Sequence, residues 1–175
     1  QSVTTRTACF NTTDLAAMDE SGTAIMVILM LIGGSPGSTA GGMKTATFAV
    51  LFLSAITVFS RRNDVQCFKR RISDETVRSA GAVLFMYLVL FFTSGVIISR
   101  VENLPLLTCL FETSSAIGTV GLSRGITRGL SAVSRVILMI LMFFGRVGGL
   151  TLIYAALPSA DSQNSRLPLE KISVG

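Results

Sequence analysis

The sequence predicts an all-α integral membrane protein, and three observations lead to that prediction. Half of the 175 residues are hydrophobic and only 14% are charged, which is too apolar for an ordinary soluble domain. Several stretches are long enough to cross the roughly 30 Å hydrocarbon core of a bilayer as helices of about 20 residues. An apolar stretch too short to cross lies between two of them. We therefore expect membrane-spanning helices with a re-entrant segment among them.

Two stretches are expected to form complete spans. Ser79 to Ser99 has no charged residue, and Val136 to Ala160 contains only Arg146. A third apolar region, Ser21 to Ser60, has Lys44 as its only charge. As one helix that region would be about 60 Å long, twice the thickness of the hydrocarbon core. It must therefore be interrupted.

The interruption is a glycine-rich segment between helices that we expect at about Thr23 to Ile32 and Lys44 to Phe59. Five glycines and a proline in ten positions prevent a regular helix. Irregular backbone at membrane depth is tolerated where it is buried in protein or lines a watery cavity, so the segment is expected to face a pore. Close helix packing at small residues is the alternative. Its residues are Gly33, Gly34, Ser35, Pro36, Gly37, Ser38, Thr39, Ala40, Gly41 and Gly42.

The distribution of cations orients the chain. Many of the fifteen Lys and Arg residues fall in the linker 61–78, which the positive-inside rule makes cytoplasmic. Lipid headgroups explain this run better than nucleic acid, because no aromatic residues alternate with the cations. Counting crossings then puts residues 1–14 and 118–123 outside and the polar tail 158–175 in the cytoplasm. Residues 1–14 lack the pattern of a signal peptide, and Gln1 suggests a cut within a longer protein.

A half-membrane helix is expected at Leu106 to Ile117, with Pro105 suited to its first turn. The next residues, Thr119, Val120 and Gly121, fit one strand of a potassium filter, where backbone carbonyls replace the hydration shell of K⁺. Glycine permits the angles that align successive carbonyls, and a threonine hydroxyl can close the inner end of the row. The triplet alone is a weak signal, and its position between a half-helix and a span strengthens it.

One strand cannot encircle an ion, so further strands are needed. Residues 5–12 also lie outside and directly precede a span, which makes them a second candidate. The other two strands would come from a preceding region of the polypeptide or from another chain.

Four motifs resemble the third and fourth pore-loop repeats of the Trk/Ktr/HKT superfamily, the Ktr-type membrane subunit especially. They are RTACFNT at 6–12, GGSPGSTAGGMKT at 33–45, SSAIGTVGLS at 114–123 and FGRVGGLTL at 144–152. The resemblance covers nearly the whole chain, with the motifs in the family's order. It implies four repeats with a K⁺-channel-like architecture, divided here into 1–60 (end of the third repeat), 61–78 (cytoplasmic linker), 79–157 (fourth repeat) and 158–175 (cytoplasmic tail).

The resemblance also assigns residue roles. It implies a third filter strand and a fourth one, and makes Gly33 to Gly42 a gating loop under the filter. Arg146 and Lys44 would belong to that gate, although purely structural roles for both remain open, since an intramembrane charge also pairs with structural partners. The filter residues, whose carbonyls would bind K⁺, are Thr7, Ala8, Cys9, Phe10, Asn11, Thr119, Val120, Gly121, Leu122 and Ser123.

Cys9 departs from the family, whose third filter strand has glycine at this position. In plant relatives a serine in place of one filter glycine accompanies Na⁺ permeation, so Cys9 puts strict K⁺ selectivity in question. The expected function is potassium uptake across a bacterial cell membrane, with Na⁺ permeation or dependence also open. No cofactor is expected in this chain beyond the transported ion.

The expected partners follow from the resemblance: a second copy of the membrane subunit, a cytoplasmic ring of nucleotide-binding regulatory subunits, and membrane lipids. A secondary carrier with broken helices is the main alternative, and it leaves the half-helix and its filter-like turn unexplained. A non-conducting membrane scaffold is the other. A membrane enzyme is disfavoured, because the sequence has no histidine and no phosphate-binding loop.

Overall fold

The computed structural model describes residues 4–7, 15, 18–60, 64–67 and 70–148. Over these ranges the chain is mostly helical, as the sequence predicts, with one short hairpin of two strands. The elements in chain order are α1 (Thr4–Thr7), α2 (Glu20–Leu31), α3 (Thr45–Phe59), β1 (Gln66–Cys67), β2 (Arg70–Arg71), α4 (Asp74–Glu102), α5 (Leu106–Ile117), the 3₁₀ turn η1 (Thr127–Gly129) and α6 (Ala132–Val147).

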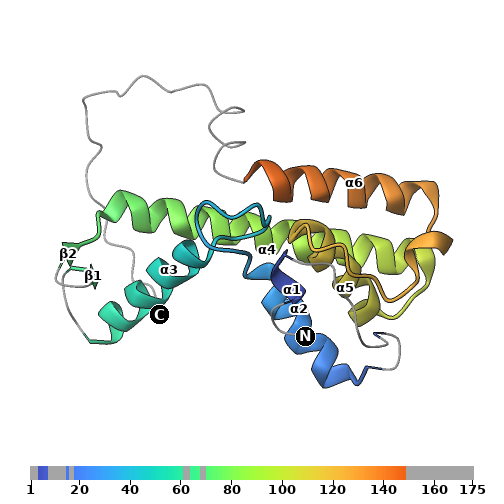
Figure 1. Ribbon diagram of the computed structural model, residues 1–175, viewed down its shortest axis with the longest axis horizontal. Coiled ribbons are helices and arrows are strands. Elements are labelled where there is room, and N and C mark those ends of the chain that lie inside the picture. Colours follow the sequence, from blue (N-terminus) through green and yellow to red (C-terminus); the bar gives the residue numbers. More distant parts are fainter. Residues whose placement is uncertain (1–3, 8–14, 16–17, 61–63, 68–69, 149–175) are drawn as a thin grey trace, which may run out of the picture.

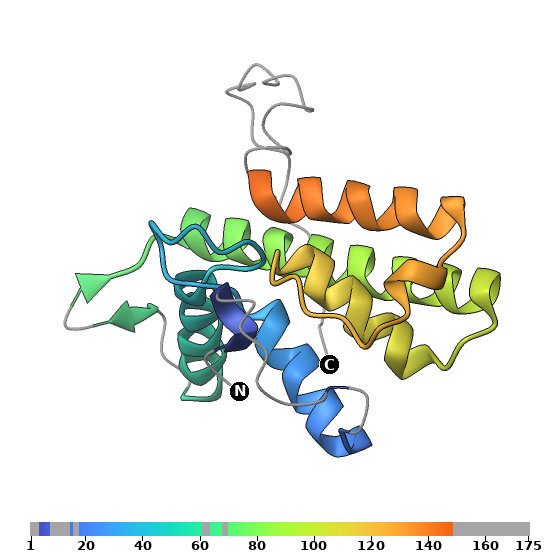
Figure 2. The ribbon, with the colours of Figure 1, turned by 45° about the vertical axis from the view of Figure 1, so that its right-hand side comes forward.

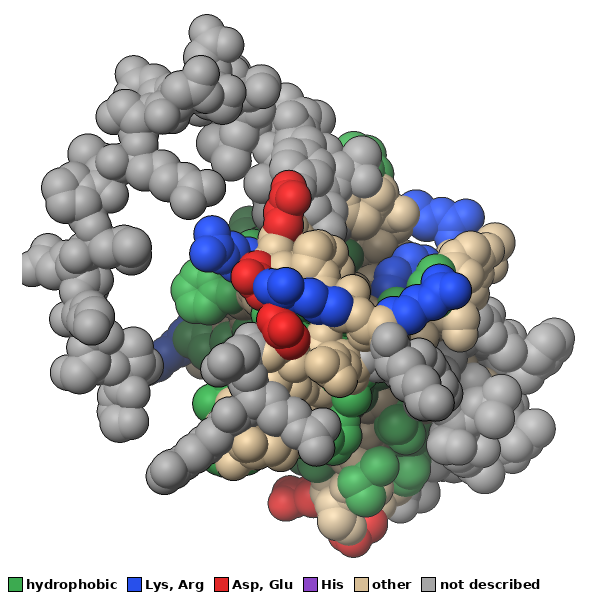
Figure 3. Space-filling view, turned by 90° about the vertical axis from the view of Figure 1, so that its left-hand side faces the viewer, with side chains coloured by type: hydrophobic (Ala, Val, Ile, Leu, Met, Phe, Trp, Pro, Cys, Tyr) green, Lys and Arg blue, Asp and Glu red, His purple; other side chains and the backbone are tan. Residues whose placement is uncertain are grey.

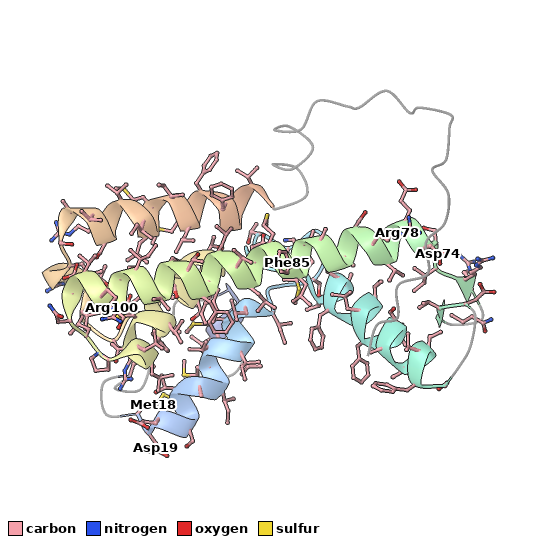
Figure 4. All side chains as sticks on the ribbon, turned by 180° about the vertical axis from the view of Figure 1, so that it is seen from behind. Met18, Asp19, Asp74, Arg78, Phe85 and Arg100 are labelled. Atoms are coloured by element: carbon pink, nitrogen blue, oxygen red, sulfur yellow. The ribbon has the colours of Figure 1, made fainter. Side chains whose placement is uncertain are left out.

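Helix α4 is the long axis of the molecule (Figure 1). Its 29 residues have a mean hydropathy of 2.3 over the most apolar window, and it is the one helix of the described residues long and apolar enough to cross a membrane. Charged residues occupy its ends, with Asp74 and Arg78 at one end and Arg100 at the other (Figure 4). A membrane span with polar residues at both surfaces has this distribution.

The start of α4 lies at Asp74, five residues before the expected Ser79. Ser73 caps the helix, because its hydroxyl accepts a hydrogen bond from the backbone N–H of Thr76 at 3.4 Å. Asp74 and Glu75 place negative charge at the positive end of the helix dipole. The helix therefore begins within the charged linker, because local capping residues, and not hydrophobicity, determine its first residue.

Helix α5 is the centre of the packing, and α2, α4 and α6 all lie against it. From Phe111 to Ile117 every residue of α5 is buried, including the polar side chains of Glu112 and Thr113. Figure 2 shows α6 layered over α4, with α5 beside them. The short helix expected at Leu106 to Ile117 is thus present over the expected residues, with α2, α4 and α6 packed against it.

The third apolar region is divided as the sequence predicts, because α2 ends at Leu31 and α3 begins at Thr45. Helix α3 has no buried residue, although it is strongly apolar. Helix α6 likewise exposes large apolar side chains, such as Met139 and Phe143. Exposed apolar surface of this extent is typical of contact with lipid or with further protein.

A small hairpin was not expected in an all-α protein. Strands β1 and β2 pair antiparallel, with Gln66 opposite Arg71. An ion pair of 3.0 Å between Arg71 and Asp64 holds one side of the hairpin. Charged side chains gather on this end of the molecule (Figure 3), so the hairpin forms within the basic linker and leaves its cations exposed.

Helix α6 is described over 16 residues and ends at Val147. The remainder of the expected last span, residues 149–160, and the tail lie outside the described residues.

Candidate functional site

The turn after α5 is fixed by the carbonyl groups at the end of that helix. The N–H of Gly118 donates to Ser114 O at 2.8 Å, that of Thr119 to Ala116 O at 3.1 Å, and that of Val120 to Ser115 O at 2.9 Å. These carbonyls would otherwise lack partners, since the last carbonyls of a helix have none within it. The filter-like triplet therefore starts in a defined position at the negative end of the α5 dipole, which favours cations.

The backbone conformation alternates between left-handed and right-handed φ values along this triplet. Thr119 has φ of 52° and Gly121 has φ of 82°, both in the left-handed region, with Val120 between them. A left-handed residue other than glycine costs about 1–3 kcal/mol and persists where its surroundings hold it in place. Alternation of this kind turns successive carbonyls toward one side, which is the backbone property that an ion-binding row requires.

Thr119 is held by the glycine-rich loop, 78 residues away in the sequence. The backbone N–H of Gly41 donates to Thr119 Oγ1 at 2.8 Å. A Cβ at position 41 would lie 2.6 Å from the Thr119 side chain, so only glycine allows this approach. The sequence predicted that this hydroxyl could close the inner end of a carbonyl row, and in the structure it accepts a bond from the loop.

A buried carboxylate holds the other end of the turn. Glu112 Oε1 accepts from Ser123 Oγ at 2.7 Å and from the backbone N–H of Arg124 at 3.0 Å, while Oε2 accepts from Thr127 Oγ1 at 3.0 Å. Glu112 is only 4% exposed. Glu112 is not among the residues predicted from the sequence. A lone acid in a short apolar helix is nevertheless a signal in itself, because an intramembrane charge is costly without a role.

The glycine-rich loop folds back on itself, so that its two ends meet. Ile32 and Met43 form a parallel bridge, and the N–H of Gly33 donates to Met43 O at 2.8 Å. A second contact ties the loop to α6, where the N–H of Gly42 donates to Gly145 O at 3.3 Å. The loop is therefore a compact feature seated between α2, α5 and α6.

Lys44 and Arg146 both bind carbonyl groups of this loop. Lys44 Nζ donates to Ala40 O at 2.8 Å and to Ser38 O at 3.2 Å. Arg146 Nη1 donates to Thr39 O. The two cations expected near the gate thus contact three successive carbonyls of the segment. Neither forms an ion pair with a carboxylate among the residues that the structure describes.

The end of α6 comes very close to the end of α5. A Cβ at Gly145 would overlap the carbonyl of Ile117, so glycine is required for the two helices to meet there. Thr119, Gly121 and Arg146 line a shared cavity of about 450 Å³ with Met142 and Phe143. Parts of the candidate filter and of the candidate gate therefore adjoin one space.

The remaining predicted residues divide into two groups. In the fourth strand, Val120 and Leu122 are buried, Gly121 is exposed, and Ser123 is bound to Glu112. In the third strand, Thr7 is the last residue of α1, while 8–11, including Cys9, lie outside the described residues. The structure thus brings the fourth strand, the loop, Lys44 and Arg146 together.

This arrangement, with a span-length helix, exposed apolar faces and a buried short helix, is typical of a helical membrane protein. A model of the family described as TrkH, a cation transport protein, matches residues 1–165. The chain belongs to this family, which comprises cation transporters and not enzymes. The resemblance to the Trk/Ktr superfamily seen in the sequence is thereby confirmed.

Three relatives illustrate the match. The Ktr system potassium uptake protein D of Bacillus subtilis is 39% identical over all of this chain and 39% of its own length. The Ktr system potassium uptake protein B of Vibrio alginolyticus is 38% identical over 88% of this chain and 34% of its own length. The potassium/sodium uptake protein NtpJ of Enterococcus hirae is 34% identical over 99% of this chain and 40% of its own length. The chain therefore spans between a third and two fifths of the length of these relatives.

Proposed function

We propose that this chain takes part in potassium uptake across a cell membrane, as the end of the third and the complete fourth of four repeats that surround one selectivity filter. Residues 119–123 form the fourth filter strand, and residues 7–11 form the third. The observation that carries the proposal is the backbone of Thr119 and Gly121, left-handed at both residues and seated at the negative end of the buried helix α5. The names of the relatives, which specify potassium uptake, support the same ion.

Residues 33–42 are proposed as the gate. This segment is in contact with the proposed fourth strand, because Gly41 is hydrogen-bonded to Thr119. Lys44 and Arg146 hold it in the position described, which we take as the closed one. Two cations close to the ion path raise the electrostatic barrier for K⁺, since like charges repel more strongly in a low dielectric. Moving the loop together with these side chains would lower that barrier.

The partners are proposed from the Ktr names, which denote a system of several components. A second copy of the membrane subunit would pair with this one, and a ring of nucleotide-binding regulatory subunits would dock on the cytoplasmic face. The exposed cations Arg70, Arg71 and Arg78 offer a docking surface at the hairpin end (Figure 3). On this topology the tail is cytoplasmic and α4 ends outside.

The secondary carrier with broken helices remains the second candidate, favoured by the break between α2 and α3. A carrier transports fewer ions per second than a pore, because it must change conformation in each transport cycle. It gives no role to the fixed left-handed turn after α5.

The test is ion uptake by cells that lack their own potassium systems. Cells would express the natural full-length polypeptide with Cys9 as written or with Cys9→Gly. We expect both forms to carry K⁺ and only the Cys9 form to admit Na⁺, since a side chain at a filter glycine displaces a carbonyl. If neither form carried K⁺ while both were present in the membrane, the pore would be excluded and the scaffold favoured.

A further inference from the structure

A second cavity, of about 300 Å³, lies behind the glycine-rich loop. Three elements enclose it: the loop end and the start of α3, the α4 side chains Val83 and Tyr87, and the last turn of α6. Both Lys44 and Arg146 line it. The cavity differs from the one beside Gly121, which Lys44 does not line.

The two cations at this cavity have donors to which the described part of the chain supplies no acceptor. Lys44 has three N–H groups and uses two of them on Ser38 O and Ala40 O. Arg146 has five and uses one on Thr39 O. All of these acceptors are neutral carbonyls, and no carboxylate is among the residues that line the cavity. Two positive charges thus share one partly enclosed space without a counter-ion in the described part of the chain.

Such a pair fits a phosphate group. Guanidinium donors match two phosphate oxygens at once, and an ammonium group adds a point charge. Charges at membrane depth are normally neutralised by a partner, because their desolvation is otherwise uncompensated. An anion between Lys44 and Arg146 would supply that partner.

The position of the cavity favours a phosphate carried by a lipid. Val83 is four residues beyond Ser79, about 6 Å along α4 from the start of the charge-free stretch. Tyr87, the other α4 residue of the lining, is eight residues beyond Ser79. The cavity therefore lies about 6–12 Å into the membrane if the basic hairpin is cytoplasmic, within reach of a phosphate from the inner leaflet. Just beyond Lys44, helix α3 exposes Phe48 and Phe52, whose rings stack at 6.5 Å. An acyl chain could lie on this apolar face while its phosphate enters the cavity.

We propose that this cavity binds a phosphate group presented by an anionic membrane lipid. The bound phosphate competes with Ser38, Thr39 and Ala40 for the two cations and so loosens the loop. The binding site stands independently of transport, whereas the effect on the gate rests on the proposed function.

The test of binding uses the natural full-length protein purified in detergent, with retained phosphatidylglycerol counted by native mass spectrometry. We expect Lys44→Gln and Arg146→Gln each to weaken retention about tenfold, the change that one charge-assisted hydrogen bond produces. Lys44→Arg, which keeps the charge, should restore most of it, and this variant also guards against misfolding. Arg100→Gln, an exposed cation at the far end of α4 and outside the cavity, is the matched control and should change little.

Two results would overturn the proposal. Equal losses in Arg100→Gln and Lys44→Gln would mean that lipid binds diffusely to surface cations. Displacement of phosphatidylglycerol by millimolar inorganic phosphate would assign the phosphate group to a free anion instead of a lipid.

The effect on the gate has its own readout, which is K⁺ flux into proteoliposomes of phosphatidylglycerol compared with phosphatidylcholine alone. We expect higher flux with phosphatidylglycerol than with phosphatidylcholine alone. Lys44→Gln should remove this difference between the two lipids. Cavity-specific binding with equal flux in both lipids would refute the regulatory role. Binding without any flux would reject the transport function and leave the lipid site standing.

Discussion

Thr119 Oγ1 accepts a hydrogen bond of 2.8 Å from the backbone N–H of Gly41. The contact joins the turn after the short helix α5 to the loop that breaks the third apolar region. These two motifs are far apart in the sequence, yet they meet at a position where a Cβ on residue 41 would not fit. The proposed filter strand and the proposed gate are therefore in direct contact.

Thr119→Val should release the loop, because valine has the shape of threonine without the hydroxyl. Loss of one hydrogen bond of about 1 kcal/mol makes local opening of the loop roughly fivefold more frequent, and amide hydrogen exchange in the loop should be faster by the same factor. Hydrogen exchange of the peptide covering residues 33–43, followed by mass spectrometry, measures this directly. Thr119→Ser, which keeps the hydroxyl, is the matched control. Equal exchange in the two variants would show that the contact does not hold the loop.

Glu112→Gln should loosen the outer end of the turn. The neutral amide weakens the bonds from Ser123 and the Arg124 N–H, and it replaces the acceptor of Thr127 with a donor. We expect a loss of about 1–3 kcal/mol in stability and a lower ratio of K⁺ to Na⁺ uptake.

Thermal unfolding and paired uptake of the two ions measure the effects of Glu112→Gln. Glu75→Gln, at the exposed start of α4, is the control: it should cost at most about 0.3–1 kcal/mol, through the helix dipole, and leave the ion ratio unchanged. An unaltered ion ratio with reduced stability would restrict Glu112 to a structural role.

The helices and the break between them could be predicted from the sequence because their causes are local. Five glycines and a proline end a helix in any surroundings, and a stretch of twelve apolar residues is too short to cross a bilayer. The predicted start of α4, Ser79, lies five residues after the observed one, because the prediction used hydrophobicity and not the helix cap at Ser73. The signal was present in Ser73, Asp74 and Glu75.

The contacts of the site could not be predicted, because they depend on how separate elements meet. Glu112 gains its partners only when the chain after α5 turns back over the helix. The hairpin Gln66–Cys67 and Arg70–Arg71 lay hidden within a run of charges that shows little alternation. The sequence predicts gate roles for Lys44 and Arg146, but their shared cavity follows from tertiary packing alone.

Gly145→Ala should separate α6 from α5, because the added Cβ would overlap the carbonyl of Ile117. Alanine in a helix is otherwise about 1 kcal/mol better than glycine. Gly81→Ala offers a matched control, since Gly81 is also helical and a Cβ there meets nothing within 4 Å. We expect Gly145→Ala to lower the unfolding temperature and Gly81→Ala to leave it equal or higher. A stabilising effect in both would mean that the close approach is not required.

Deletion of residues 35–40 should raise ion flux severalfold in the natural full-length protein. The deletion removes the carbonyls of Ser38, Thr39 and Ala40, to which Lys44 and Arg146 are bound. The chain can close over the gap, because the backbones of Gly33 and Gly41 are already in contact and the N–H of Thr45 donates to Gly34 O at 3.2 Å. The helices α2 and α3 should therefore keep their positions.

Uptake of K⁺ by deficient cells at limiting external concentration measures this change. The matched control replaces residues 35–40 by six alternating glycines and serines, which keeps the length of the loop and its backbone carbonyls. We expect this variant to conduct at a rate between those of the parent and the deletion, because the carbonyls remain but the conformation is less fixed. Flux that is unchanged in the deletion, with normal amounts of protein in the membrane, would show that the loop does not limit the passage of ions.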